Sequence, residues 1–178
     1  LMQLCETLSA DEARCGIGHT RWATHGGVTD TNAHPHAYGR VTLVHNGIIE
    51  NYQELAAKYG FGDKLSSQTD TEVVAALLDY YYEGDPGVAV FQTVRELKGT
   101  FALAVLFEDI PDTIYAIRNV SPIIAGVGKD AGESFLASDV TALTDYVEQY
   151  FVLPEYTLAA LSEDGITLTN DKGEIIEP

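Results

Sequence analysis

The 178-residue sequence has few cysteines, few basic residues and no long apolar run, and each shortage excludes a class of protein. Its two cysteines, Cys5 and Cys15, are too few for a disulfide scaffold, so we expect a reduced, cytoplasmic protein. With 10 basic against 27 acidic residues, the net charge of −17 disfavours nucleic acid and anionic membranes as partners. The longest apolar run, 101–107, is too short to span a membrane, and no secretory signal opens the chain.

Helix and strand signals along the chain predict one α+β domain over 1–178. Alternating β-branched residues at 41–45 predict a strand that stops at Asn46-Gly47, and helical spacing follows at 48–59. Thr69-Asp70-Thr71-Glu72 is a capping-box signal for a helix that starts near residue 70. The further expectations are helices at 3–13, 87–98 and 139–146, a loop at 26–39, and strands at 15–23, 101–107, 113–118, 122–127, 134–137, 150–153, 157–162 and 165–169. This order indicates helices stacked on antiparallel sheet.

All five histidines and the only tryptophan fall between residues 19 and 45. One interpretation is a metal site in which His34 and His36 lie close together and His19, His25 or His45 completes the set. The spacing matches no structural zinc pattern, however, and the cluster contains neither a cysteine pair nor a carboxylate. The more frequent alternative is that the imidazoles donate to loop carbonyls and hold a long connection rigid. We therefore predict no metal and no cofactor.

A second interpretation is a site for a free amino acid. Arg21 carries the only guanidinium of the cluster, and its fork suits an α-carboxylate. Asp70, at a predicted helix start, is placed to accept hydrogen bonds from an α-ammonium. The alternatives are a surface ion pair for Arg21 and simple helix capping for Asp70, and taken alone the two residues favour these alternatives.

The Asn46-Gly47 step also has two interpretations. A side-chain amide and the next backbone N–H can point together at a developing oxyanion. Asn-Gly is equally the strongest short signal for a tight turn, and on spacing alone the turn is favoured.

Four longer motifs bear on these alternatives. They are Gly-His-Thr-Arg-Trp-Ala-Thr-His-Gly at 18–26, Asn-Ala-His-Pro-His at 32–36, Val-His-Asn-Gly-Ile-Ile-Glu-Asn at 44–51 and Thr-Asp-Thr-Glu-Val at 69–73, with Ala-Ser-Asp at 137–139 after them. In this order they resemble the glutaminase domain of the glutamine–fructose-6-phosphate aminotransferases (isomerizing). The resemblance runs from about residue 14 to the end of the chain.

This resemblance implies a glutaminase with a four-layer α/β/β/α sandwich of the N-terminal-nucleophile hydrolase type. Such a domain hydrolyses the side-chain amide of glutamine and passes ammonia to a sugar-phosphate isomerase domain. The present sequence does not resemble that second domain, so we expect it elsewhere in a parent chain that forms homo-oligomers. Neither nucleic acid nor membrane is implied as a partner.

The resemblance also implies which residues bind the substrate. Arg21 would bind the α-carboxylate of glutamine, helped by Thr24 and His25, and Asp70 would bind the α-ammonium. These roles agree with the chemistry inferred above for the cation and the anion.

The implied catalytic residues are Asn46 and the backbone N–H of Gly47, which form the oxyanion hole, while Trp22 lies beside the site and helps gate the ammonia route. The family's nucleophile is a cysteine at the N-terminus of the mature chain, with its own α-amino group as base. Cys5 lies outside the motifs, and Cys15 falls where a core strand and an inert thiol are expected. We therefore expect a domain incomplete at its N-terminus and inactive alone. A non-catalytic glutamine-binding or assembly module is the alternative function.

Overall fold

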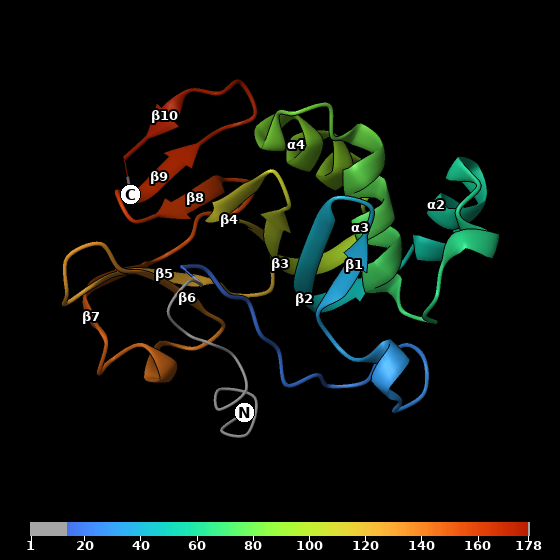
Figure 1. Ribbon diagram of the computed structural model, residues 1–178, viewed down its shortest axis with the longest axis horizontal. Coiled ribbons are helices and arrows are strands. Elements are labelled where there is room, and N and C mark those ends of the chain that lie inside the picture. The colour runs from blue at the N-terminus through green and yellow to red at the C-terminus, as the bar shows by residue number, and fades with distance from the viewer. Residues whose placement is uncertain (1–13, 178) are drawn as a thin grey trace.

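The computed structural model describes residues 14–177 as an α+β fold with two antiparallel sheets (Figure 1). The strands are β1 (His36–Tyr38), β2 (Val41–Ile49), β3 (Gly99–Phe107), β4 (Ile110–Asn119), β5 (Ile124–Gly128), β6 (Ser134–Ala137), β7 (Val147–Val152), β8 (Leu158–Ser162), β9 (Gly165–Thr169) and β10 (Ile175–Ile176). The helices are α2 (Tyr52–Tyr59), α3 (Asp70–Tyr81) and α4 (Pro86–Glu96), with 3-10 turns η1 (Asp30–Asn32), η2 (Gly62–Lys64) and η3 (Val140–Ala142). The helix expected at 3–13 and Cys5 lie outside the described residues.

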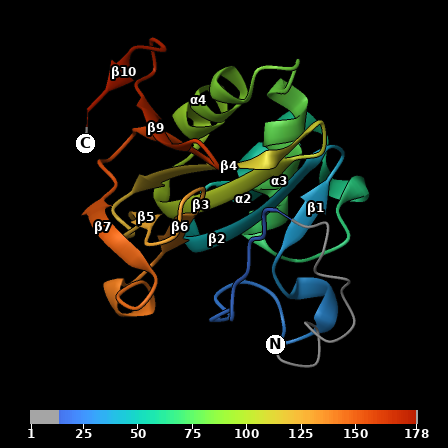
Figure 2. The same cartoon turned by 60° about the vertical axis from the view of Figure 1, so that its left-hand side comes forward.

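The larger sheet has the strand order β1-β2-β3-β4-β8-β9-β10, and the smaller sheet the order β6-β5-β7. Helices α2, α3 and α4 lie on one side of the molecule and the smaller sheet on the other (Figure 1). Figure 2 shows β2 and β3 side by side, with α3 along them. No helix of the described residues is long and apolar enough to cross a membrane.

Alternation along β3 gives the larger sheet a core on each face. Phe101 and Leu103 are fully buried in the core that α3 and α4 share with the sheet. The residue between them, Ala102, points to the opposite face, where it joins a second core with Leu136 of β6 and Leu161 of β8. Since strand side chains alternate between faces, this period of two produces a helix layer, a sheet and a second sheet.

The outer face of the smaller sheet has its own small core. Phe135 and Ala137, the neighbours of Leu136, pack there with Val140 and Leu143. The helix expected at 139–146 is thus wrong in extent, because only the 3-10 turn η3 forms before the chain turns into β7. The four-layer sandwich implied by the resemblance has a helical layer outside the smaller sheet. The described residues form only the 3-10 turn η3 of that layer.

The strand expected at 15–23 is wrong, because these residues form no regular secondary structure. Within this segment the Arg21 N–H donates a hydrogen bond to Nδ1 of the His19 side chain and not to a neighbouring strand. Arg21 also adopts a positive φ of 56°. A left-handed residue interrupts strand geometry, so the segment remains a connection. The loop expected at 26–39 does form, but it also holds η1 and the short strand β1.

The strand at 41–45 is confirmed but does not stop at Asn46-Gly47, since β2 continues to Ile49. Gly47 pairs with Phe101 of β3, so the step is not a tight turn. Its φ of 145° is open to glycine alone, and a Cβ there would overlap the carbonyl oxygen of Thr100. The helix expected from 48 accordingly begins later, at Tyr52.

The expected helix starts at residues 70 and 87 are confirmed. Thr69 caps α3 by accepting a hydrogen bond from the Glu72 N–H at 3.2 Å. Asp85 caps α4 in the same way, with Pro86 as its first residue. The Glu72 carboxylate does not complete a capping box, because it accepts hydrogen bonds from Ser66 and Ser67 instead.

Candidate active site

The motif residues converge on a cavity of about 270 Å³ between the connection at 19–25, the end of β2 and the start of α3. Its lining includes all the site residues that the sequence predicts, namely Arg21, Trp22, Thr24, His25, Asn46, Gly47 and Asp70. Residues far apart in the chain therefore line one cavity.

Asp70 presents a buried carboxylate to this cavity. Its Oδ2 accepts a hydrogen bond from the Ile49 N–H at 2.8 Å, and its side chain is 5% exposed. Helix capping is not its role, because Thr69 caps α3. The Nδ1 atoms of His25 and His45 lie 3.8 and 3.9 Å from the same Oδ2, beyond hydrogen-bond distance. The carboxylate thus retains acceptor capacity at the positive end of a helix dipole.

Arg21 is held by its own loop. Its Nη1 donates to the Gly27 carbonyl at 3.0 Å and its Nη2 to the His25 carbonyl at 3.1 Å. No carboxylate in residues 14–177 forms an ion pair with it, so the surface ion pair is wrong for the described part of the chain. A guanidinium has five N–H donors, and the fork therefore retains donors for an anionic ligand.

Asn46 and Gly47 form the wall of the cavity on β2. Asn46 is exposed and pairs with Ala102 of β3, and Gly47 follows with its unusual φ. A residue with that φ is rotated about its N–Cα bond relative to a regular strand. Both a side-chain amide and an irregular backbone segment therefore border the same space as Asp70.

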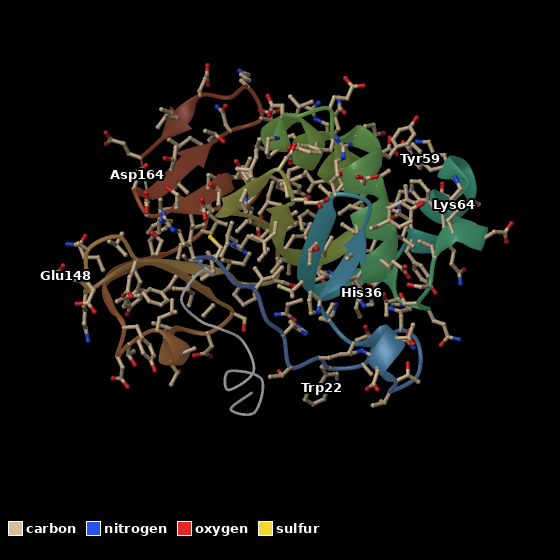
Figure 3. The ribbon with its side chains drawn as sticks, in the orientation of Figure 1. Trp22, His36, Tyr59, Lys64, Glu148 and Asp164 are labelled. Atoms are coloured by element: carbon tan, nitrogen blue, oxygen red, sulfur yellow. The ribbon has the colours of Figure 1, made fainter. Side chains whose placement is uncertain are left out.

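Trp22 and Thr24 lie at the mouth of the cavity. Trp22 is 90% exposed and projects outward from the connection (Figure 3). Thr24 is exposed as well. These two residues can contact a ligand only from the solvent side.

Three of the histidines lie within hydrogen-bond distance of threonine hydroxyls, and His36 also donates to the backbone of Asn32 in the loop at 26–39, as expected. His34 Nε2 lies 3.0 Å and His45 Nδ1 3.1 Å from the hydroxyl of Thr71. His36 Nε2 lies 3.1 Å from the hydroxyl of Thr69. The imidazoles therefore gather at the first turn of α3. No group of three metal-binding side chains within residues 14–177 is arranged to hold an ion.

These imidazoles are neutral. Burial lowers the pKa of His34 to about 3, and neighbouring His19 and His36 add to the effect. Burial also lowers the pKa of His36 and of His45. The site therefore holds uncharged rings beside the Asp70 carboxylate at neutral pH.

Thr71, which bridges two histidines, was not predicted from the sequence. It lies inside the Thr-Asp-Thr-Glu motif, which indicates a helix start and supports the resemblance but assigns no role to this hydroxyl. A hydroxyl on the buried side of a first helical turn, in a chain with clustered histidines, is the signal that points to it.

Cys15 lies away from this cavity. It is half-buried and lines a separate hollow with Asp112 and Glu133. Burial raises the pKa of its thiol, and the nearby Asp112 raises it further. The thiol is thus less reactive than a free cysteine, as expected, although Cys15 lies in an irregular connection and not in a strand.

The fold resembles that of two solved enzymes. The glutamine phosphoribosylpyrophosphate amidotransferase from B. subtilis superimposes with a TM-score of 0.68 at 20% identity, over 88% of this chain and 35% of that one. The allosteric regulatory enzyme of purine biosynthesis gives 0.69 at 21% identity, over the same shares. These likenesses confirm the α+β fold of the N-terminal-nucleophile hydrolase type.

The family match places the chain in the class of glutamine amidotransferase domains. Residues 19–145 match the family described as the glutamine amidotransferase domain, and the chain belongs to that family.

Individual relatives of the chain carry a more specific name than the family. The chain is 49% identical over 168 residues to the glutamine–fructose-6-phosphate aminotransferase (isomerizing) of Symbiobacterium thermophilum, covering 93% of this chain and 27% of the relative. It is 47% identical over 166 residues to that of Aquifex aeolicus, covering 92% and 28%. The chain therefore spans about a quarter of the length of these relatives.

Proposed function

We propose that this chain binds glutamine for hydrolysis, with Arg21 holding the α-carboxylate and Asp70 the α-ammonium. One observation carries the proposal: a guanidinium fork with spare donors and a buried carboxylate with spare acceptors line the same 270 Å³ cavity. A zwitterion presents those two charges at the two ends of its α-carbon. A free α-amino acid such as glutamine satisfies both groups at once.

The resemblance assigns His25 to the α-carboxylate, but its position beside Asp70 suits it to complete the ammonium site instead. Its Nδ1 is buried and has no hydrogen-bond partner among residues 14–177, and it lies 3.8 Å from the Asp70 Oδ2. An ammonium group carries three donors, so it can bond the carboxylate and this nitrogen together. Thr24, at the mouth, adds a hydroxyl toward the α-carboxylate, and Trp22 shields the entrance.

Asn46 and Gly47 stabilise the oxyanion. Attack on the side-chain amide carbon turns its carbonyl oxygen into an oxyanion, which the Asn46 Nδ2–H and the Gly47 N–H can bond. The C–N bond then breaks, ammonia leaves, and water supplies the oxygen of the new carboxylate in glutamate. No residue within 14–177 is assigned the role of nucleophile, since Cys15 lines a different hollow.

The parent protein follows from the relatives. We infer that it is a glutamine–fructose-6-phosphate aminotransferase, in which ammonia from this domain reaches a sugar-phosphate isomerase domain and the full chains associate as a homo-oligomer. The support is 41–49% identity to relatives of that name over about nine-tenths of this chain. The full-length protein should convert glutamine and fructose 6-phosphate into glutamate and glucosamine 6-phosphate.

Calorimetric titration of the chain with three ligands tests the binding proposal. L-Glutamine should bind, whereas glutaramate, which lacks the α-ammonium, and γ-aminobutyramide, which lacks the α-carboxylate, should each bind about ten- to a hundredfold more weakly. If all three bind alike, the cavity does not recognise the amino-acid end and the proposal fails.

A further inference from the structure

One buried side chain, that of Asn32, joins the two charged groups of the site. Its Nδ2 donates to the Gly27 carbonyl at 3.0 Å, and the same carbonyl accepts from Arg21 Nη1 at 3.0 Å. Its Oδ1 accepts from the Gln68 N–H at 2.9 Å, and Gln68 lies two residues before Asp70. Asn32 thus links the loop that holds the guanidinium to the segment that carries the carboxylate.

Backbone groups fix the orientation of the Asn32 amide. The Gln68 N–H can only donate and the Gly27 carbonyl can only accept, so Oδ1 faces Gln68 and Nδ2 faces Gly27. The same Nδ2 lies 3.3 Å from the Gln68 Oε1, which also accepts from the Gly27 N–H at 3.4 Å. Each oxygen accepts no more hydrogen bonds than it has lone pairs, and Nδ2 has a hydrogen for each of its two acceptors. All these contacts can therefore exist together.

Asn32 is 3% exposed but lines no part of the active-site cavity. Its side chain packs directly on the loop, since a Cβ at Gly26 would lie 2.7 Å from its Nδ2. Its backbone is held separately, because its N–H donates to the Thr29 carbonyl at 3.2 Å and His36 donates to its carbonyl. The side-chain amide is therefore not needed to hold the 3-10 turn η1, and its hydrogen bonds serve the link between the loop and Gln68.

We propose that Asn32 is a positioning residue that sets the separation between the Arg21 guanidinium and the Asp70 carboxylate, and that this separation selects α-amino acids. The inference rests on the proposed function for the class of ligand. An α-amino acid carries its ammonium and carboxylate on one carbon, whereas a β-amino acid has one more CH₂ between them. When both binding groups are fixed in advance, the ligand of matching span binds without strain and the longer one does not.

Loss of the Asn32 amide would leave the two binding groups loosely connected. The remaining hydrogen bond between the loop and Gln68 in the described part of the chain is the 3.4 Å contact of the Gly27 N–H. Arg21 would still be bonded to its own loop, but that loop could shift relative to Asp70. The site should then accept either span, at a lower affinity for the α-amino acid.

Ligand selectivity of the full-length protein in which the sequence occurs tests the proposal. Calorimetry measures the affinities of L-glutamate and of L-β-homoglutamate, which has the extra CH₂, and neither ligand contains an amide to hydrolyse. Wild type should prefer L-glutamate by about thirtyfold or more. Asn32→Ala should weaken L-glutamate binding about tenfold and change L-β-homoglutamate binding by less than about threefold, so that the preference falls.

Asn51→Ala is the matched control for the loss of a buried asparagine. The Asn51 side chain also joins two segments, donating to the Glu96 carbonyl and accepting from the Lys98 N–H, both at 2.9 Å, but it lines no part of the cavity. This variant should lower the midpoint of urea unfolding about as much as Asn32→Ala and leave the ligand preference unchanged. An equal loss of preference in both variants would mean that general destabilisation, and not positioning, is responsible.

Gln68→Ala provides a second test that applies even if Asn32→Ala does not fold. The Gln68 side chain is exposed, and its removal deletes the two hydrogen bonds of Oε1 while the bond from the Gln68 N–H to Asn32 remains. The preference for L-glutamate should therefore fall by a smaller factor, about threefold.

The two proposals fail in different ways. An unchanged preference in Asn32→Ala, or in Gln68→Ala if only that variant folds, overturns the positioning role. Wild type that binds L-glutamate and L-β-homoglutamate equally well also overturns it, but leaves the proposed function intact. Wild type that binds neither ligand contradicts both proposals.

Discussion

Among single residues, the capacity of the site to bind a ligand lies in polar groups that the protein leaves unsatisfied. Asp70 has one backbone donor at 2.8 Å, and Arg21 uses two of its N–H groups on loop carbonyls. His25 Nδ1 is buried without any partner in residues 14–177. Because unsatisfied buried groups cost free energy, they are expected where a ligand completes them.

Asp70→Asn should weaken L-glutamine binding by about thirtyfold, because the isosteric amide keeps the shape but loses the charge that attracts an ammonium. Calorimetry at neutral pH measures the change. The matched control is Asp85→Asn, an acid at the start of α4 that lines no part of the active-site cavity and caps its helix equally well as asparagine. Equal affinities in the two variants would show that Asp70 does not bind the ligand.

Asn46→Ala should lower kcat for glutamine hydrolysis by the full-length protein by about 10²- to 10³-fold with little change in KM, because the lost donor acts on the transition state. Initial rates of glutamate release provide both constants. Gln149→Ala, which removes an exposed amide on β7, should change neither. A rise in KM with kcat intact would instead make Asn46 a binding residue.

The sequence predicted the residues of the site better than their bonding. Arg21 and Asp70 followed from charge and motif, whereas the roles of Thr71 and the neutral histidines did not. Which hydroxyl meets which imidazole depends on how α3 packs on β2, and a linear pattern does not contain that information.

Among the elements, β2 shows how tertiary pairing overrides a local signal. Asn-Gly favours a turn, yet pairing with β3 in register from Val41 to Ile49 carries the strand through it. The connection at 15–23 shows the opposite case, since a segment expected to be a strand forms none where Arg21 adopts a left-handed φ. The helix starts near residues 70 and 87 were predicted well because Thr69 and Asp85 act locally on their own first turns.

Gly47→Ala should destabilise the fold by about 3 kcal/mol or more, because a Cβ would meet the Thr100 carbonyl in a backbone conformation closed to alanine. Urea unfolding measures the loss. Gly165→Ala is the control, since its φ of 114° is also positive but nothing lies within 4 Å of its Cβ position. It should cost only about 1–2 kcal/mol. Similar losses would show that close contact with β3 is unimportant.

For the whole molecule, the sequence predicted that helices pack on antiparallel sheet, but it did not predict the extent of each layer. The run of strands, helices and strands indicated α+β, and the period of two in β3 sorted its residues onto two faces. The outer layer depended on 139–146, where a 3-10 turn formed in place of a helix. Its apolar residues, such as Leu143, fill the core without a helical period.

Acid should destabilise the whole fold through its buried histidines. The folded chain holds the pKa of His34 at about 3, against an ordinary value of 6.5, so between these values the unfolded chain binds the extra proton. The stabilising contribution is complete above pH 6.5 and falls as pH decreases toward 3, and solvent around the half-buried ring reduces its size. Urea unfolding from pH 7 to pH 4 should show a shallower decline for His34→Gln than for wild type. Parallel curves would mean that His34 is not held neutral.

Glutamate release from glutamine is the measurement that tests the central claim most directly. It should be run side by side on wild type and Asp70→Asn, in the 178-residue chain and in the full-length protein in which the sequence occurs. We predict release by the full-length wild type, strongly reduced by Asp70→Asn at subsaturating glutamine, and none by the chain alone. Full-length protein that binds glutamine but never releases glutamate would contradict the account and favour a non-catalytic glutamine-binding module.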